Sequence, residues 1–137
     1  MKTDAFVDTS GFYALLVSKD DGHARAAAIL REAAKRRSGF VTTDYVLDES
    51  ATLLRARGYG HLVDQVFDIV FGSTACRLVW MDPAQFARTR RFFTKHDDHD
   101  WSFTDCFSFQ VMKELRLTKA LTKDAHFREA GYEPLLV

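Results

Sequence analysis

Short apolar runs alternate with longer amphipathic segments along the whole chain. Each apolar run is brief, lacks the 3.6-residue period of a helix, and leads into a turn or a helix start, which is typical of a buried strand. The pattern predicts strands at Ala5–Val7, Gly39–Thr43, Arg77–Trp80 and Ala120–Thr122, with an edge strand at Tyr132–Val137.

Between these runs, apolar residues recur at the spacing of one helix face, as Ala27, Leu30 and Ala34 do. Asp82 and Pro83 supply an N-cap and a proline at the first helical position, which indicates a helix start. Helices are predicted over Phe12–Val17, Ala24–Arg37, Tyr45–Arg57, Leu62–Phe71 and Pro83–Lys95, and onward from Ser102–Asp105.

This order of elements indicates an α/β fold. Strands that alternate with helices, and that lie too far apart for hairpins, indicate a mainly parallel central sheet covered by helices on both faces. With 137 residues, the chain has about the length of one domain of roughly 150 residues. We therefore expect a single domain over residues 1–137.

Composition narrows the class of protein. Hydrophobic residues make up 47%, and 19 Lys and Arg balance 19 Asp and Glu, so contact with nucleic acid has to be local. Cys76 and Cys106 form no CxxC pair and favour free thiols. The sequence has no apolar stretch of about 18 residues and no leader-like N-terminus. We expect a cytoplasmic protein without a membrane span.

Two aspartates follow strands that we expect at the centre of the sheet. Asp8 comes directly after Ala5–Val7, and Asp124 lies just past Ala120–Thr122. In parallel sheets, ligands gather beyond the carboxyl ends of the strands. Either aspartate alone is explained by a helix cap or a turn, but the pair together favours a site at this edge.

A third acid lies at the margin of a buried helix face. Around Ser50, the apolar positions place Glu49 at the edge of that face and turn its neighbour Asp48 toward solvent. A carboxylate in this position needs a partner. That partner is either a cation within the fold or an arginine, with Arg55 and Arg57 the nearest choices.

A fourth acid, Asp105, opens the helix that follows Ser102. The two residues have the spacing of a capping box, which is a sufficient local explanation. A helix N-terminus also keeps a carboxylate ionised and available to a metal ion. Three further acids lie just upstream, and crowding of so many carboxylates favours a hard divalent cation; they are Asp97, Asp98 and Asp100.

Other catalytic signatures are missing from the sequence. A phosphoaspartate hydrolase needs a second aspartate two positions after Asp8, where this chain has Ser10, and no P-loop, GxSxG or GxGxxG occurs. His96 and His99 lack a second ligand pair for zinc, so we expect them to be solvated. We expect the other histidines to be isolated and superficial: His23, His61 and His126.

The acidic segments occur in an order and spacing that resemble those of a known family. They are Phe6-Val7-Asp8-Thr9-Ser10, Thr43–Glu49, Asp98–Cys106 and Leu121-Thr122-Lys123-Asp124. Over about Asp4 to Val137, the chain resembles a PIN domain, specifically the VapC-type toxin ribonucleases of toxin-antitoxin pairs. The resemblance implies a three-layer α/β/α PIN-like domain.

The resemblance also implies roles for particular residues. The family's acidic positions fall on Asp8, Glu49, Asp105 and Asp124, which would hold Mg²⁺ or Mn²⁺. Asp8 and Asp105 are expected as direct ligands, and Glu49 and Asp124 as ligands either directly or through water. Neighbouring hydroxyls and outer acids complete the implied set: Thr9, Ser10, Thr104, Asp98 and Asp100.

The function implied is a metal-dependent endoribonuclease, the toxin of a type II pair, which hydrolyses RNA and is restrained by a cognate antitoxin. The resemblance also implies a homodimer, and the phenylalanine runs around residues 92–93 and 103–109 fit a helix core and an association face. The alternative is a noncatalytic PIN-like module that binds RNA or protein. Four intact acids favour the enzyme.

A basic helix face is a candidate for contact with RNA phosphates. Arg88, Arg91 and Lys95 recur at helical spacing on the helix that leads into the acidic loop before Asp105. A solvated helix surface explains the same pattern equally well.

Overall fold

A five-stranded, all-parallel sheet forms the centre of the molecule in the computed structural model, which describes residues 2–137. The sheet order is β3-β2-β1-β4-β5, so that β1 is central and pairs with β2 and β4. The strands are β1 (Lys2–Val7), β2 (Ser38–Thr43), β3 (Cys76–Val79), β4 (Lys119–Leu121) and β5 (Glu133–Pro134).

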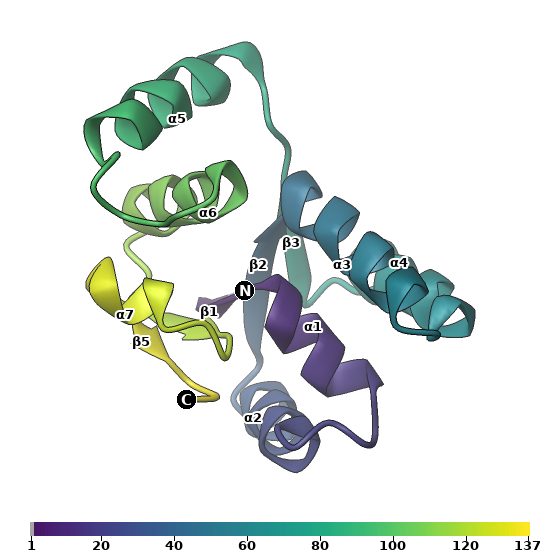
Figure 1. Ribbon diagram of the computed structural model, residues 1–137. Coiled ribbons are helices and arrows are strands. Elements are labelled where there is room, and N and C mark those ends of the chain that lie inside the picture. The colour runs from purple at the N-terminus through teal and green to yellow at the C-terminus, as the bar shows by residue number, and fades with distance from the viewer. Residues whose placement is uncertain (1) are drawn as a thin grey trace.

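Helices cover both faces of this sheet and make the three layers expected from the alternation of elements. Figure 1 shows α1 to α4 gathered on one side, and α5, α6 and α7 on the other. The helices are α1 (Thr9–Leu16), α2 (His23–Lys35), α3 (Asp44–Ala56), the 3₁₀ turn η1 (Gly60–Leu62), α4 (Val63–Gly72), α5 (Pro83–Lys95), α6 (Phe103–Glu114) and α7 (His126–Glu129).

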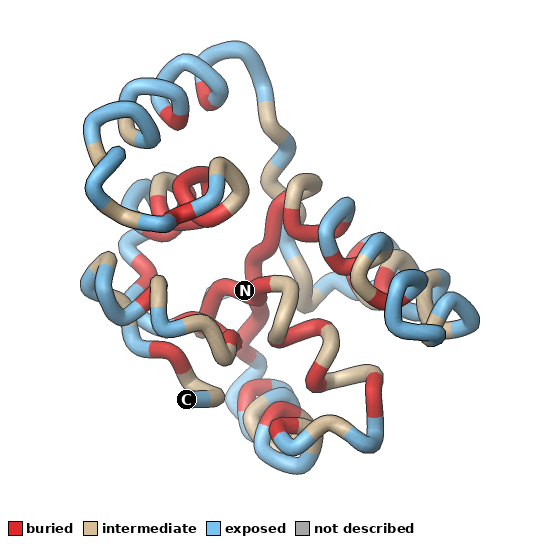
Figure 2. Tube along the Cα trace, viewed as in Figure 1, coloured by how far each residue is buried: buried red, intermediate tan, exposed pale blue. Residues whose placement is uncertain are grey.

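The core lies where the sheet meets these layers. Every residue of β2 is buried, and so are the last three of β1. On the α6–α7 side, the Phe127 ring packs against Phe6 and Phe109, with centroids 6.3 and 5.0 Å away. Figure 2 shows that α5 is mostly exposed, so it is an outer layer that rests on α6.

Local capping explains several helix starts. The Asp82 side chain accepts a hydrogen bond from the Gln85 amide at 2.7 Å, with Pro83 in the first turn, as the sequence predicts. The Thr43 hydroxyl accepts one from the Val46 amide at 3.1 Å and so begins α3 at the end of β2. These caps fix the ends of neighbouring strands against the helices that follow them.

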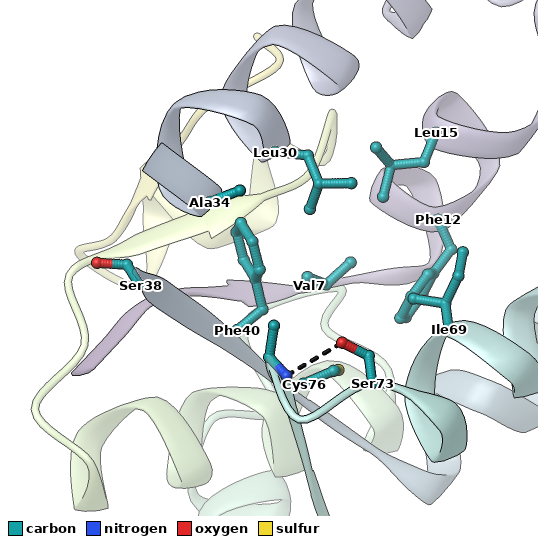
Figure 3. A pocket seen from close by; sticks show the side chains of 11 residues that line it. Val7, Phe12, Leu15, Leu30, Ala34, Ser38, Phe40, Ile69, Ser73 and Cys76 are labelled. Carbon is teal, nitrogen blue, oxygen red and sulfur yellow. Dashed lines mark hydrogen bonds between the residues drawn. The ribbon is translucent and has the colours of Figure 1, made fainter. Parts of the chain in front are cut away.

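The predicted inward stripe of α2 is wrong by one residue. The fully buried residues of this helix are Ala26 and Ala33, while Leu30 and Ala34 are exposed. Alanine-rich helices give a weak phase signal, because small side chains pack on either side. Leu30 and Ala34 instead line an apolar groove of about 280 Å³ (Figure 3), with further walls from α1, α4, β2 and β3.

Some predicted boundaries also shift. Helix α1 begins at Thr9 rather than Phe12, because the Asp8 carbonyl already accepts the amides of Gly11 and Phe12. The edge strand is only Glu133–Pro134 instead of six residues, and α7 was not predicted. Both elements are too short to carry a hydrophobic period.

Two histidines before α6 pack against aromatic rings. The His99 ring stacks on Trp101 with centroids 3.9 Å apart, and the His96 ring packs 4.2 Å from that of Phe92. The expectation that both histidines are solvated is therefore wrong, since aromatic packing leaves each half-buried.

Two simpler expectations concern the cysteines and the membrane. Cys76 and Cys106 are both free thiols in the part of the chain that the structure describes. None of the helices in residues 2–137 is long and apolar enough to cross a membrane.

Candidate active site

The register of the sheet brings two of the acids to one edge. Phe6 and Val7 of β1 lie opposite Ala120 and Leu121 of β4, so the carboxyl ends of these strands are level. Asp8 directly follows β1, and Asp124 comes three residues after β4. The predicted meeting of these acids at the edge of the sheet agrees with this geometry.

Asp8 occupies the N-cap position of α1, but its side chain does not cap the helix. The carboxylate accepts no capping hydrogen bond from the amides of Ser10 or Gly11, and its Oδ2 accepts one from the Thr122 hydroxyl at 2.9 Å. Burial raises the pKa of Asp8 to about 7, although hydrogen bonds from the Thr9 amide and the Thr122 hydroxyl act to lower it. A simple capping role is thus excluded for this residue.

Asp105 both caps a helix and belongs to the acidic cluster. It forms the predicted capping box: Ser102 Oγ accepts the Asp105 amide at 3.0 Å, and Asp105 Oδ2 accepts the Ser102 amide at 3.1 Å. The same Oδ2 lies 3.3 Å from Nδ1 of His126. Burial raises the pKa of Asp105, opposed by the Ser102 amide, and the charge of Asp124 raises it further.

His126 joins two of the acids. Its Nδ1 lies 3.3 Å from Asp105 Oδ2 and 3.4 Å from Asp124 Oδ1, and one ligand atom of each of the three residues lies within 4.8 Å of the others. Partial burial lowers the pKa of His126, but the charges of Asp124 and Asp105 outweigh burial and raise it overall.

The expectation of an isolated, superficial His126 is therefore wrong. The contact arises because α7 begins two residues after Asp124, whose carboxylate accepts the His126 amide at 2.8 Å. The available signal was the two-residue spacing between Asp124 and His126, because a histidine so near a site acid in the sequence also lies near it in space. Residue type alone gave no reason to select it.

Glu49 approaches the cluster from α3. Its Oε1 lies 3.4 Å from the Thr9 hydroxyl. Glu49 as a whole residue is exposed, but partial burial of its carboxylate raises its pKa. A hydrogen bond from Thr104 lowers this pKa, and the charge of Asp105 raises it. Of the three hydroxyls implied by the resemblance, Thr9 and Thr104 thus lie against this acid, whereas Ser10 contacts Thr122 instead.

The arginine alternative for Glu49 has no support in residues 2–137. Neither Arg55 nor Arg57 forms an ion pair with Glu49 there, and the Arg57 guanidinium instead lies 5.1 Å from the centre of the Tyr13 ring. Asp48 is exposed, as its helical phase predicts.

A shallow cleft extends the site between α1 and α3. It has a volume of about 360 Å³ and is lined by Thr9, Asp48, Glu49, Thr52, Leu53 and Ala56. One wall therefore carries an acid of the cluster, and the cleft gives an extended ligand access to it.

The outer acids do not join the cluster. Asp97, Asp98 and Asp100 are exposed. The acid whose charge raises the pKa of Asp105 is Asp124, and the ligand atoms grouped with those of Asp105 belong to Asp124 and His126. The stacking of His99 on Trp101 fixes the loop between them, and the flanking acids stay in solvent.

The basic helix face is present but partly engaged. Arg88, Arg91 and Lys95 are exposed on α5, and Arg88 Nε lies 3.3 Å from Glu114 Oε1 of α6. The remaining two side chains form no ion pair within the described chain.

The donor set fits a hard divalent cation. Within residues 2–137, no Lys or Arg forms an ion pair with Asp8, Glu49, Asp105 or Asp124. Three of these acids have raised pKa values, with burial as the largest cause, and the His126 imidazole lies beside two of the four acids, Asp105 and Asp124. Among residues 2–137, ligand atoms of Asp105, Asp124 and His126 lie within 4.8 Å of one another, and carboxylate oxygens are the ligands that Mg²⁺ and similar ions take.

Comparison with known proteins agrees with this arrangement. The chain matches the PIN domain family over residues 5–132. It is 32% identical over 127 residues to a protein of two Mycobacterium tuberculosis strains named 23S rRNA-specific endonuclease VapC20, covering 93% of this chain and 94% of that protein.

Solved structures extend the likeness to the fold. The crystal structure of M. tuberculosis VapC20, described as a sarcin-ricin loop cleaving toxin, is similar with a TM-score of 0.82 and 29% identity, over 94% of this chain and 96% of that one. PAE2754 from Pyrobaculum aerophilum shares the fold at a TM-score of 0.65 and 17% identity, over 98% and 91%. The family match, which spans nearly all of the chain, shows that this protein belongs to the PIN domain family.

Proposed function

We propose that this chain is a divalent-metal-dependent endoribonuclease and the toxin of a type II toxin-antitoxin pair, acting as a single PIN domain over residues 1–137. The observation that carries the proposal is the convergence of Asp8, Glu49, Asp105 and Asp124 without a Lys or Arg partner among residues 2–137. A noncatalytic scaffold has no reason to keep such a cluster, because it costs stability.

In this proposal, the acids divide the work of holding the ion. Asp8 and Asp105, the more buried pair, bind directly, and Glu49 and Asp124 bind directly or through water. Bound Mg²⁺ or Mn²⁺ would supply Lewis-acid stabilisation of the phosphodiester and a more acidic water. Thr9 and Thr104, whose hydroxyls reach Glu49, orient that carboxylate or the attacking water.

The substrate proposed is RNA, with ribosomal RNA the first to test. The similar VapC20 protein is named for 23S rRNA and the sarcin-ricin loop, and its identity to this chain supports a related substrate. The cleft between α1 and α3 gives a strand access to Glu49. We accordingly propose that the protein acts in the cytoplasm, where ribosomes are found.

A cleavage assay tests the activity. Purified protein is incubated with 23S rRNA in EDTA, Mg²⁺ or Mn²⁺, and the 5′ ends are mapped. We expect discrete cuts that need the metal, that disappear in Asp8→Asn, and that persist in the adjacent-acid control Asp48→Asn. RNA binding without cuts under all three conditions would instead establish the noncatalytic module.

We also propose a cognate antitoxin that inserts a basic side chain among the carboxylates. An Arg or Lys from a partner would pair with Asp8, Asp105 or Asp124 and exclude both cation and phosphate. Co-purification with the neighbouring gene's product tests this. Inhibition should weaken as Mn²⁺ rises, and should vanish when the partner's basic residue becomes alanine.

A homodimer is the oligomeric state we propose. Phe86 and Phe93 of α5 are 46% and 40% exposed, and each packs against Phe103, with ring centroids 5.2 and 5.6 Å away. Exposed aromatic clusters of this kind are typical of association faces. Sedimentation should give a dimer for the wild type and a monomer for Phe93→Asp.

A further inference from the structure

A single buried hydroxyl connects two of the site acids. Thr122, which directly follows β4, is completely buried. Its Oγ1 donates a hydrogen bond to Asp8 Oδ2 at 2.9 Å and accepts one from the Asp124 amide at 3.0 Å. The first bond holds the side chain of Asp8, which follows the central strand β1, and the second holds the turn that carries Asp124.

The hydrogen bonds around Thr122 run in one direction. A threonine hydroxyl has one proton, and with Asp8 ionised, as it is when it binds a cation, the Thr122 proton is directed to Asp8, so that the Ser10 hydroxyl, 3.1 Å away, donates to Thr122. Ser10 Oγ in turn accepts the Lys123 amide at 2.8 Å. The chain from Lys123 through Ser10 and Thr122 therefore ends at the Asp8 carboxylate and leaves no polar atom of the two hydroxyls free.

This arrangement depends on an unusually close approach of α1 to β4. A Cβ atom at Gly11 would lie 2.1 Å from the Leu121 carbonyl oxygen, which no side chain can tolerate. Glycine at this position lets the first turn of α1 rest on the end of β4. Ser10 is thereby brought to the backbone and hydroxyl of the residues after the strand.

We propose that Thr122, supported by Ser10, is a positioning residue that fixes Asp8 and Asp124 relative to each other for cation binding. The inference rests on the proposed function, because it assigns Thr122 a role through the acids of that site. Carboxylate ligands of metal ions are commonly held by hydrogen bonds of this kind, and loss of such a bond typically costs roughly 10–100-fold in metal affinity.

Three substitutions separate positioning from a merely structural role. Thr122→Val keeps the branched shape and removes the hydroxyl, and Thr122→Ser keeps the hydroxyl. Thr42→Val is the matched control: Thr42 is equally buried on β2, on the other side of β1, but its hydroxyl donates to the Val7 carbonyl at 2.9 Å instead of to a carboxylate. Mn²⁺ affinity is measured by calorimetry on each folded protein, and melting temperature is recorded without metal.

We expect Thr122→Val to weaken Mn²⁺ binding by roughly 10–100-fold, with Thr122→Ser close to wild type. Thr42→Val should lower the melting temperature but leave Mn²⁺ affinity unchanged. Equal Mn²⁺ affinity in wild type and Thr122→Val would overturn the inference. If Thr122→Val does not fold, Ser10→Ala replaces it, and unchanged affinity in that variant overturns the inference equally.

Failure of the inference and failure of the proposed function give different results. If wild type and Asp8→Asn bind Mn²⁺ equally weakly, the cation site itself is refuted. If wild type binds Mn²⁺, Asp8→Asn does not, and Thr122→Val matches wild type, the cation site stands and only the positioning role is lost.

Discussion

Asp8 and Asp105 stand at the first turns of two different helices, and their carboxylates are used differently. Asp8 lies in the N-cap position of α1 and accepts no capping bond from the next turn, whereas Asp105 completes a reciprocal capping box with Ser102. Both are buried in the same cluster. Position at a helix start therefore does not decide whether an aspartate serves the helix.

The two aspartates therefore differ in what they contribute to the stability of the fold. The Asp105 carboxylate accepts a hydrogen bond from the Ser102 amide at the start of its helix, and this bond offsets part of the free-energy cost of burying the carboxylate. Asp8 has its Thr122 contact but makes no side-chain capping bond to α1, and its pKa is raised to about 7. We infer that Asp8 costs the metal-free fold more than Asp105 does. Two stability measurements test this contrast, and two cleavage measurements test the roles of the acids in the site.

The largest expected effect is the loss of RNA cleavage in Asp8→Asn. A metal ion contributes several kcal/mol to the transition state, which corresponds to a factor on the order of 10³ in rate. Asp105→Asn should lose activity to a similar extent, because the contrast concerns stability only. Single-turnover cleavage rates measure both, and a variant Asp8→Asn that retains most of its rate would remove Asp8 from the site.

The next effect compares adjacent acids on α3. Glu49→Gln should lower the cleavage rate by roughly 10²-fold, the size of losing one electrostatic contact in an active site. Asp48→Asn, one residue away and exposed, should stay close to wild type. Equal rates for the two variants would mean that Glu49 is no more than a surface acid near Thr9.

Stability without metal should fall as pH rises. The folded pKa of Asp8, about 7, exceeds its ordinary value of 3.8, so its contribution is fully present below about pH 4 and is lost as pH rises through 7. Raised pKa values at Asp105, Glu49 and His126 act in the same direction.

Urea unfolding in EDTA should show a fall in the free energy of unfolding on the order of 2 kcal/mol between pH 5 and pH 8. Asp8→Asn should flatten most of this slope. Saturating Mn²⁺ should reduce the fall too, because the cation stabilises the ionised carboxylates. A wild-type slope of opposite sign would contradict the burial of Asp8.

The smallest effect distinguishes the two acids by sign. Asp105→Ala removes a cap and should lower the free energy of unfolding by about 1 kcal/mol at pH 7.5 without metal. Asp8→Asn removes a buried charge and no cap, so it should raise that free energy under the same conditions. If both variants are destabilised alike, Asp8 serves the helix after all.

Much of the fold followed from sequence pattern. The order of strands and helices, the parallel sheet, the Asp82-Pro83 helix start and the Ser102–Asp105 capping box were predicted from local rules, and the structure agrees with each. The helix start and the capping box depend on neighbouring residues only, whereas the parallel sheet follows from the alternation of strands and helices along the chain. The alanine-rich α2 was misphased because its small side chains carry little signal.

The features of the site that were missed depend on tertiary contacts. His126 reaches Asp105 because a four-residue helix follows Asp124, and so short an element has no period to detect. Thr122 was hidden within an ordinary strand pattern, and its contact with Asp8 spans 114 positions. Asp97, Asp98 and Asp100 are expected as acids of the site because the sequence shows how many charges lie near Asp105 but not where they point. The stacking of His99 on Trp101, which positions this loop, cannot be read from the sequence.

The placement of the central strand has a consequence for the timing of synthesis. Strand β1 emerges first from the ribosome, but one of its two neighbours, β4, is made last but one among the strands, and Asp8 meets Thr122 and Asp124 only then. At about 5–20 residues per second, domains fold largely as units during translation. A nascent chain that lacks residues 119–124 lacks Asp124, one of the four acids, and Thr122, the hydroxyl that contacts Asp8, so the proposed site is completed only late in synthesis.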